Sequence, residues 1–182
     1  MLPWILSLAL APQDAALARV KQTAYARITT ARSVAQDAQI VAFVAARNAQ
    51  PESSEEVRRK DALWIAGATY PLRRTLTQGD CAARLRALLA EDPIVVESLL
   101  IDAQGALVCA SAEPSDYWQG DEAKWQETFQ QGKDPFIDEP ALDASTNQYA
   151  IQLSVPVSRD QKRIGALTLT LRLPRDSAGT IR

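Results

Sequence analysis

The sequence contains no histidine and only two cysteines among its 182 residues. The absence of histidine removes the commonest general base and metal ligand, and it excludes any Ser-His-Asp or Cys-His catalytic arrangement. The cysteines, Cys81 and Cys109, do not form a CxxC pair, so the spacing of a zinc site is missing. We therefore expect no bound metal and no cofactor.

Positive charge is not in excess either. The chain carries 20 Lys and Arg against 22 Asp and Glu, a net charge of −2, whereas nucleic-acid binding needs a basic face. The sequence has no nucleophile–base pair and no glycine-rich phosphate loop. Adjacent acids such as Asp121 and Glu122, or Asp138 and Glu139, do not converge on one point. We therefore expect no nucleic-acid partner and no enzymatic activity.

The first residues, MLPWILSLALA, form an apolar run that is too short to span a bilayer as a helix. Its length and its ending in small residues are typical of a signal peptide, although no basic residue precedes it. We predict a signal peptide over residues 1–18 and export of the rest. The alternative is a buried N-terminal segment of a cytosolic protein. With 47% hydrophobic and 23% charged residues, the remainder fits a single globular domain over 19–173.

The N-terminal half has the periodicity of helices. Apolar residues at steps of three and four predict one long helix over 13–49, of which 19–49 belongs to the domain. Pro51 ends this helix, and a helical segment follows over 55–91. In this segment we predict that Trp64 is a buried structural residue.

From residue 94 onward the sequence favours strands. The runs IVVESLLI (94–101) and ALVCASA (106–112) flank the turn DAQG and predict a hairpin. A helix of about three turns is predicted over 121–132, and a short strand near PFIDE. Residues 147–157 and 162–173 alternate with a period of two. This order predicts an α+β domain whose core, 94–173, holds a five-stranded antiparallel sheet with the long helix across one face, followed by a tail over 174–182.

Three segments in order, IDAQGALVCAS, SDYWQGDEAKWQ and QLSVPVSRDQKRIGAL, resemble the Cache/PDC family of extracytoplasmic, PAS-like sensor domains of bacteria. The resemblance covers residues 15–173. It implies a PAS-like sheet, a periplasmic location, and a small-molecule pocket on the sheet face opposite the long helix. Family members usually sit between two transmembrane helices of a receptor, kinase or cyclase, whereas this sequence ends in PRDSAGTIR. We expect either an autonomous periplasmic protein or the ectodomain of a longer one.

The segment SDYWQGDEAKWQ gathers three aromatic residues among charges, in a chain with only 6% aromatic residues. Small-molecule sites combine apolar walls with a few placed polar groups, and the resemblance makes residues 113–133 a lid over the pocket. The predicted ligand-binding residues are Tyr117, Trp118, Asp121, Trp125, Asp143 and Tyr149. Lys124, Lys133, Arg73 and Arg74 are the candidate cations for a ligand carboxylate. For each residue a structural role stays open; Trp125 and Phe129, for example, share a helix face that could simply fix the helix to the sheet.

The resemblance implies a periplasmic domain that binds a small polar or ionised organic molecule, such as an amino acid, carboxylate or amine, without turnover. Such a domain would supply a ligand signal to a separate membrane histidine kinase or chemoreceptor. The alternative is a protein-interaction module that docks on such a receptor without a small ligand. In an oxidising compartment Cys81 and Cys109 either form a disulfide between the helical and sheet halves or remain two small buried hydrophobic residues.

Overall fold

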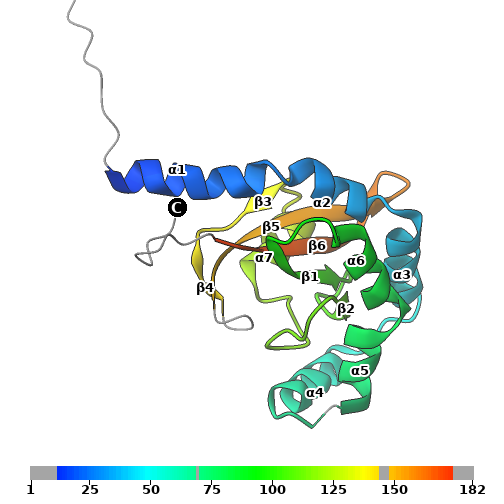
Figure 1. The fold of residues 1–182 in the computed structure, drawn as a ribbon. Coiled ribbons are helices and arrows are strands. Elements are labelled where there is room, and N and C mark those ends of the chain that lie inside the picture. The colour runs from blue at the N-terminus through cyan, green and yellow to red at the C-terminus, as the bar shows by residue number, and fades with distance from the viewer. Residues whose placement is uncertain (1–11, 69, 144–147, 174–182) are drawn as a thin grey trace, which may run out of the picture.

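The computed structural model describes residues 12–68, 70–143 and 148–173. The N-terminal half is helical (Figure 1): α1 (Pro12–Tyr25), α2 (Ile28–Ala35), α3 (Ala38–Asn48), α4 (Ser54–Ile65), α5 (Tyr70–Gln78) and α6 (Asp80–Leu89). The second half contains β1 (Val95–Ile101), β2 (Leu107–Ala110), α7 (Ala123–Trp125), the π-helical η1 (Gln126–Gln130), β3 (Phe136–Ile137), β4 (Ala141–Asp143), β5 (Gln148–Arg159) and β6 (Lys162–Arg172). The predicted signal peptide and tail fall largely outside the described residues.

The strands form one antiparallel sheet in the order β2-β1-β6-β5-β3, and β4 also pairs with β5. The predicted α+β class with an antiparallel sheet is confirmed, and β4 is an additional short strand. The hairpin between β5 and β6 turns on Asp160 and Gln161, which both have positive φ. Two such residues between paired strands form the tight turn whose twist matches that of the strands.

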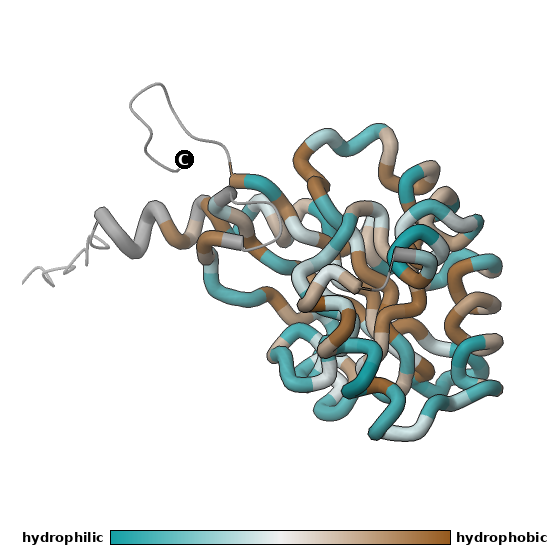
Figure 2. The backbone as a smooth tube through the Cα atoms, turned by 90° about the horizontal axis from the view of Figure 1, so that it is seen from below, coloured by the Kyte–Doolittle hydropathy of each residue, from teal (hydrophilic) through white to brown (hydrophobic). Residues whose placement is uncertain are grey.

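Alternation along the strands separates two hydrophobic clusters, one on each face of the sheet. Leu100 belongs to the cluster that α1, α2, α3 and α6 cover, whereas its neighbours Leu99 and Ile101 belong to the other. The second cluster also contains Trp64 of α4, with Tyr117 and Trp125 from the segment after β2. Figure 2 shows hydrophobic stretches gathered in the interior and hydrophilic ones on many outer turns. The sheet face away from α1 is thus the face that the segment after β2 covers.

The prediction of one uninterrupted helix over 19–49 is wrong, because the chain breaks twice, after Tyr25 and after Ala35. At the second break the carboxylate of Asp37 accepts hydrogen bonds from the backbone N–H groups of Gln39 and Ile40 and so caps α3. Arg84 of α6 forms an ion pair with the same carboxylate at 2.5 Å and lowers its pKa. An N-cap carboxylate starts a new helix, although the apolar stripe runs through the break.

The predicted helix over 121–132 is shorter than expected. A single α-helical turn, Ala123–Trp125, continues as the π-helical turn η1. π-Helical turns are rare in proteins, and those that occur often lie at functional sites. Gly132 follows with φ of 78°, a conformation that glycine adopts at no steric cost.

Cys81 of α6 and Cys109 of β2 form a disulfide with a Cα–Cα distance of 5.9 Å. The bond ties the helical layer to an edge strand of the sheet. Among the described residues, no helix combines the length and the apolar character that crossing a membrane requires.

We expect that replacing Trp64 with alanine lowers the free energy of unfolding by about 3–5 kcal/mol, because its side chain is fully buried. Its indole N–H also donates to the carbonyl of Pro114 at 3.0 Å. Urea unfolding of the purified protein measures the change. The neighbouring Ile65 is 66% exposed, so Ile65→Ala is a matched control that should change stability by less than about 0.5 kcal/mol. Equal effects of the two substitutions would contradict the assigned role of Trp64.

Reduction of the disulfide should lower the free energy of unfolding by roughly 2–4 kcal/mol, since the bond closes a loop with a sequence separation of 28 residues. Urea unfolding with and without reductant measures this difference. The Cys81→Ser/Cys109→Ser double variant is the control and should not respond to reductant. Two free thiols in protein prepared under oxidising conditions, titrated after denaturation, would show that the bond is absent.

Candidate functional site

A pocket of about 280 Å³ lies on the sheet face away from α1. Its walls come from three parts of the chain: strands β1 and β5, the segment 114–124 that follows β2 (the covering segment), and the stretch from β3 to β4. The lining residues are Glu97, Leu99, Pro114, Ser115, Gln119, Glu122, Lys124, Asp138, Glu139, Ala141, Leu142, Ala150 and Gln152. The position agrees with the sequence expectation of a pocket beneath residues 113–133, but no aromatic residue is among the described residues that form its walls.

The buried part of the pocket comes from the sheet. Glu97 and Leu99 are buried on β1, and Ala150 is buried on β5. The carboxylate of Glu97 accepts a hydrogen bond from the hydroxyl of Thr170 at 3.2 Å. A buried acid among apolar strand residues requires polar partners, and Glu97 gives this floor a polar group that a small molecule can reach.

Among the described residues of the lining, Lys124 supplies the one cation. Its side chain is only 6% exposed, and its ammonium forms an ion pair with Glu122 at 2.8 Å. Lys124 lies within the short helix α7, which places the pair at the edge between the covering segment and the pocket. Since a buried ammonium needs a counterion, Glu122 stabilises Lys124 in this position.

Gln119 is buried beside the same pocket, with 1% of its surface exposed. Its Nε2 group donates to the backbone carbonyl of Asp116 at 3.2 Å and also to the Asp116 carboxylate. Its Oε1 atom has no hydrogen-bond partner. A buried amide oxygen without a partner is unfavourable, so this atom is a ready acceptor for a donor that enters the pocket.

Asp116 lies in an environment that disfavours its charge. Burial, followed by the negative charge of Glu122, raises the pKa of Asp116 from 3.8 to about 6. Lys124 acts in the opposite direction, and Asp61 adds a further negative charge. Two acids, Glu122 and Asp61, and one lysine therefore act on the Asp116 carboxyl.

Helix α4 fixes the covering segment from outside the pocket. The Asp61 carboxylate accepts hydrogen bonds from the backbone N–H groups of Tyr117 and Trp118 at 3.0 and 2.9 Å. The indole of Trp64 bonds to Pro114, and Arg73 of α5 forms an ion pair with Glu113. Residues 113–118 are thus attached to the α4–α5 pair.

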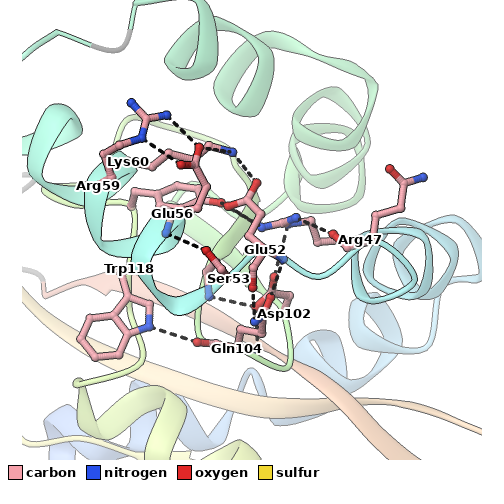
Figure 3. Close-up of polar contacts among 12 residues, drawn as sticks. Arg47, Glu52, Ser53, Glu56, Arg59, Lys60, Asp102, Gln104 and Trp118 are labelled. Atoms are coloured by element: carbon pink, nitrogen blue, oxygen red, sulfur yellow. Dashed lines mark hydrogen bonds and ion pairs between the residues drawn. The ribbon is translucent and has the colours of Figure 1, made fainter.

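A second polar network joins α3 and α4 to the turn between β1 and β2 (Figure 3). The Arg47 guanidinium forms ion pairs with Asp102 at 3.3 Å and with Glu52 at 3.1 Å, and it donates to the Tyr117 hydroxyl at 3.0 Å. Although burial opposes its charge, Lys60 and Arg47 lower the pKa of Glu52. Burial raises the pKa of Asp102, whose carboxylate accepts from the backbone N–H groups of Gln104 and Ala106.

The predicted aromatic site residues lie in this framework and not in the pocket walls. Tyr117 is buried, and its hydroxyl bonds to Arg47 and Glu52. The indole of Trp125 donates to the carbonyl of Asp102 at 2.9 Å and stacks on Phe129. Trp118 donates to the carbonyl of Gln104 at 3.0 Å and lines a smaller cavity of about 120 Å³. The aromatic residues fix the covering segment to the core, and burial removes Tyr117 and Trp125 from any docking surface.

The other three predicted residues are placed differently. Asp121 is exposed and is not among the pocket-lining residues. Tyr149 is 40% exposed, while Gln152, three positions further along β5, lines the pocket. Asp143 ends β4 and pairs with Gln148; its part in ligand binding stays a prediction.

Several lining residues were not predicted from the sequence. Glu97 carried a usable signal, because it is the single acid within the apolar run IVVESLLI. Lys124 had been considered as a cation. Gln119, Asp138 and Glu139 gave no comparable signal, since polar residues between elements are common in loops. Within the described ranges, no group of three or more cysteine and acidic side chains is placed to hold a metal ion.

We expect Asp116→Asn to stabilise the protein at pH 7.5 and to have no such effect near pH 3. A carboxyl pKa that folding raises from 3.8 to about 6 destabilises the folded state increasingly as the pH rises between these two values, and it costs nothing well below pH 3.8, where the group is protonated in both states. The gain should be about 1–3 kcal/mol, and asparagine keeps an acceptor for Gln119. Urea unfolding at both pH values measures it. The exposed Asp121→Asn variant is the control. An equal gain there, or an undiminished gain for Asp116→Asn at pH 3, would contradict the argument.

No protein-family model matches the sequence, and no curated protein does. Solved structures of sensor domains are similar to it. The ligand-binding domain of Pseudomonas fluorescens chemoreceptor CtaA in complex with L-isoleucine has 16% identity and a TM-score of 0.47, over 87% of this chain and 52% of that one. The Vibrio cholerae histidine kinase DctB sensor domain has 15% identity and a TM-score of 0.46, over 88% of this chain and 54% of that one.

The sensory domain of the Campylobacter jejuni chemoreceptor Tlp3 with isoleucine bound gives 16% identity and a TM-score of 0.42, over 90% of this chain and 64% of that one. The chain spans about half of the length of the CtaA and DctB structures. At these TM-scores the similarity carries no argument about function, which has to come from the pocket.

Proposed function

We propose that this chain is a periplasmic sensing domain that binds a small polar organic molecule in the sheet-face pocket, without turnover, and supplies the signal to a separate membrane receptor or kinase. The observation that carries the proposal is the buried polar lining of the pocket. Lys124, Gln119 and Glu97 are each buried around one cavity. A protein that used this face only for stability would gain more from apolar packing there.

The size and chemistry of the pocket support a small ligand. A cavity of about 280 Å³ is close to the lower end of the range for small-molecule sites. Its apolar members, including Leu99, Ala150 and Leu142, offer a limited hydrophobic surface beside the polar groups. The acids and the lysine of the lining bind and orient an ionised molecule through hydrogen bonds. No strong nucleophile–base pair contributes to the lining, so we expect the molecule to be released unchanged.

The attachment of the covering segment supports a route for the signal. Residues 113–118 contact the pocket on one side and α4 and α5 on the other, through Asp61, Trp64 and Arg73. A ligand that binds Lys124 and Gln119 therefore acts on a segment that is bonded to an outlying helical pair. This arrangement makes α4 and α5 the elements most directly affected by binding.

A thermal-shift screen of metabolites tests the binding function. A ligand at 100 times its Kd should stabilise the protein by roughly 2.7 kcal/mol. Gln152→Phe should abolish the shift, because the larger side chain fills the pocket from β5 while the backbone bonds of the strand remain. Ser158→Phe, at an exposed position of the same strand, is the matched control and should bind normally. A shift that survives Gln152→Phe would place the ligand elsewhere, and conversion of the ligand to product would identify an enzyme.

A further inference from the structure

We propose that the sheet-face pocket selects a small organic ammonium ion, such as an alkyl diamine, over zwitterionic and dicarboxylate molecules of the same length. This inference rests on the proposed function, and it names the class of ligand. Two independent observations carry it: the balance of charges in the lining, and the unpartnered oxygen of Gln119.

Acids dominate the charged lining of the pocket. Four carboxylates, Glu97, Glu122, Asp138 and Glu139, stand against the single ammonium of Lys124. Glu139 forms an ion pair with Lys21 of α1 at 2.5 Å, and Asp138 accepts a backbone N–H bond from Glu139 at 2.8 Å. Opposite charges attract more strongly in a partly enclosed site than in water, so the lining favours a cation.

The single cation of the lining is already paired. The Lys124 ammonium lies 2.8 Å from the Glu122 carboxylate, and both residues belong to the lining. A ligand carboxylate that approached Lys124 would have to displace Glu122 or lie next to its negative charge. Either event costs free energy, so a zwitterion gains from its ammonium and loses at its carboxylate.

Gln119 adds an acceptor whose orientation is fixed. Both bonds from its Nε2 group go to Asp116, one to the carbonyl and one to the carboxylate. Rotating the amide by half a turn would place an oxygen against these two acceptors, so Oε1 keeps its position. This buried and unpartnered oxygen accepts an N–H donor, and an ammonium has three such donors. A carboxylate has none.

The surroundings of Asp116 agree with this assignment. Burial and then the charge of Glu122 raise its pKa, Lys124 lowers it, and Asp61 of α4 raises it further, so two acids and one lysine act on this carboxyl. An ammonium bound next to Gln119 would balance this charge. Negative charge is therefore found around the covering segment as well as in the lining of the pocket.

Three four-carbon molecules give a direct test by isothermal titration calorimetry. Putrescine carries two ammonium groups, 4-aminobutyrate one ammonium and one carboxylate, and succinate two carboxylates. We expect a Kd for putrescine at least about tenfold lower than that for 4-aminobutyrate, and no measurable binding of succinate. Tighter binding of 4-aminobutyrate or succinate than of putrescine overturns the inference and leaves the proposed function standing. If these three and a broad panel of amines, amino acids and carboxylates all fail to bind, the proposed function fails as well.

Two pairs of variants test whether the named groups cause the selectivity. Asp138→Asn removes a lining charge and keeps an acceptor for the Glu139 N–H, and it should raise the Kd for putrescine at least about fivefold. Asp160→Asn removes the same charge at the exposed hairpin turn between β5 and β6 and should leave Kd unchanged. Equal effects of the two would reduce the selectivity to net charge and overturn the assignment of the pocket.

The second pair concerns the acceptor. Gln119→Leu removes Oε1 and should raise the Kd for putrescine at least about fivefold, while Gln126→Leu should not, since Gln126 lies in η1 outside the lining. Circular dichroism and urea unfolding establish that each variant folds. If Gln119→Leu does not fold, the comparison of Asp138→Asn with Asp160→Asn decides alone. Asp138 is partly exposed, so its substitution should leave the protein folded. Unchanged putrescine binding in folded Gln119→Leu would remove Gln119 from the site.

Discussion

The contact between the Arg47 guanidinium and the turn Asp102–Gly105 is the interaction on which the position of the covering segment depends. Asp102 is buried beneath the turn and holds it by accepting two backbone hydrogen bonds, while Arg47 compensates its charge. The backbone carbonyls of the same turn accept the indole N–H groups of Trp118 and Trp125. One buried carboxylate therefore organises the end of α3, the β1–β2 hairpin, and the covering chain at Trp118 and Trp125. Removing one partner from such a pair would leave a buried charge uncompensated, at a cost of about 3–5 kcal/mol.

The close packing at this turn adds a steric constraint. Gly105 has φ of +80°, and a Cβ atom there would lie 2.4 Å from the Cα of Gly120. A side chain at Gly105 would thus meet the backbone of the covering segment as well as the strain of a left-handed conformation. The segment DAQG predicts a turn, but only the fold shows that its glycine also admits the chain that covers the pocket.

The sequence predicted those parts of the molecule whose signals are local and repeated. The period of two along β5 and β6 and the turn residues of the β1–β2 hairpin were sufficient for the sheet, and the position of the pocket followed from the resemblance. The helix break at Asp37 was missed because the apolar stripe continues through it, whereas the competing signal is one capping carboxylate. Tyr117 and Trp125 were assigned to the pocket because aromatic residues among charges favour a site. Their polar atoms instead bond to Arg47 and Asp102, which the sequence places far from them.

The two polar clusters of the domain differ in how completely they are satisfied, and this difference separates framework from site. Around Arg47, its ion pairs and hydrogen bonds provide a counterion or donor for Glu52, Asp102 and the Tyr117 hydroxyl. Beside the pocket, Gln119 keeps an oxygen without a partner and Asp116 lies where its charge is unfavourable. Buried polar groups are normally paired, so an unpaired one stands out where the neighbouring framework is complete. The covering segment joins both clusters, since Tyr117 belongs to the framework and Gln119 to the pocket, two residues apart along the chain. A ligand that satisfies Gln119 would therefore act on a segment that is bonded to the framework through Tyr117.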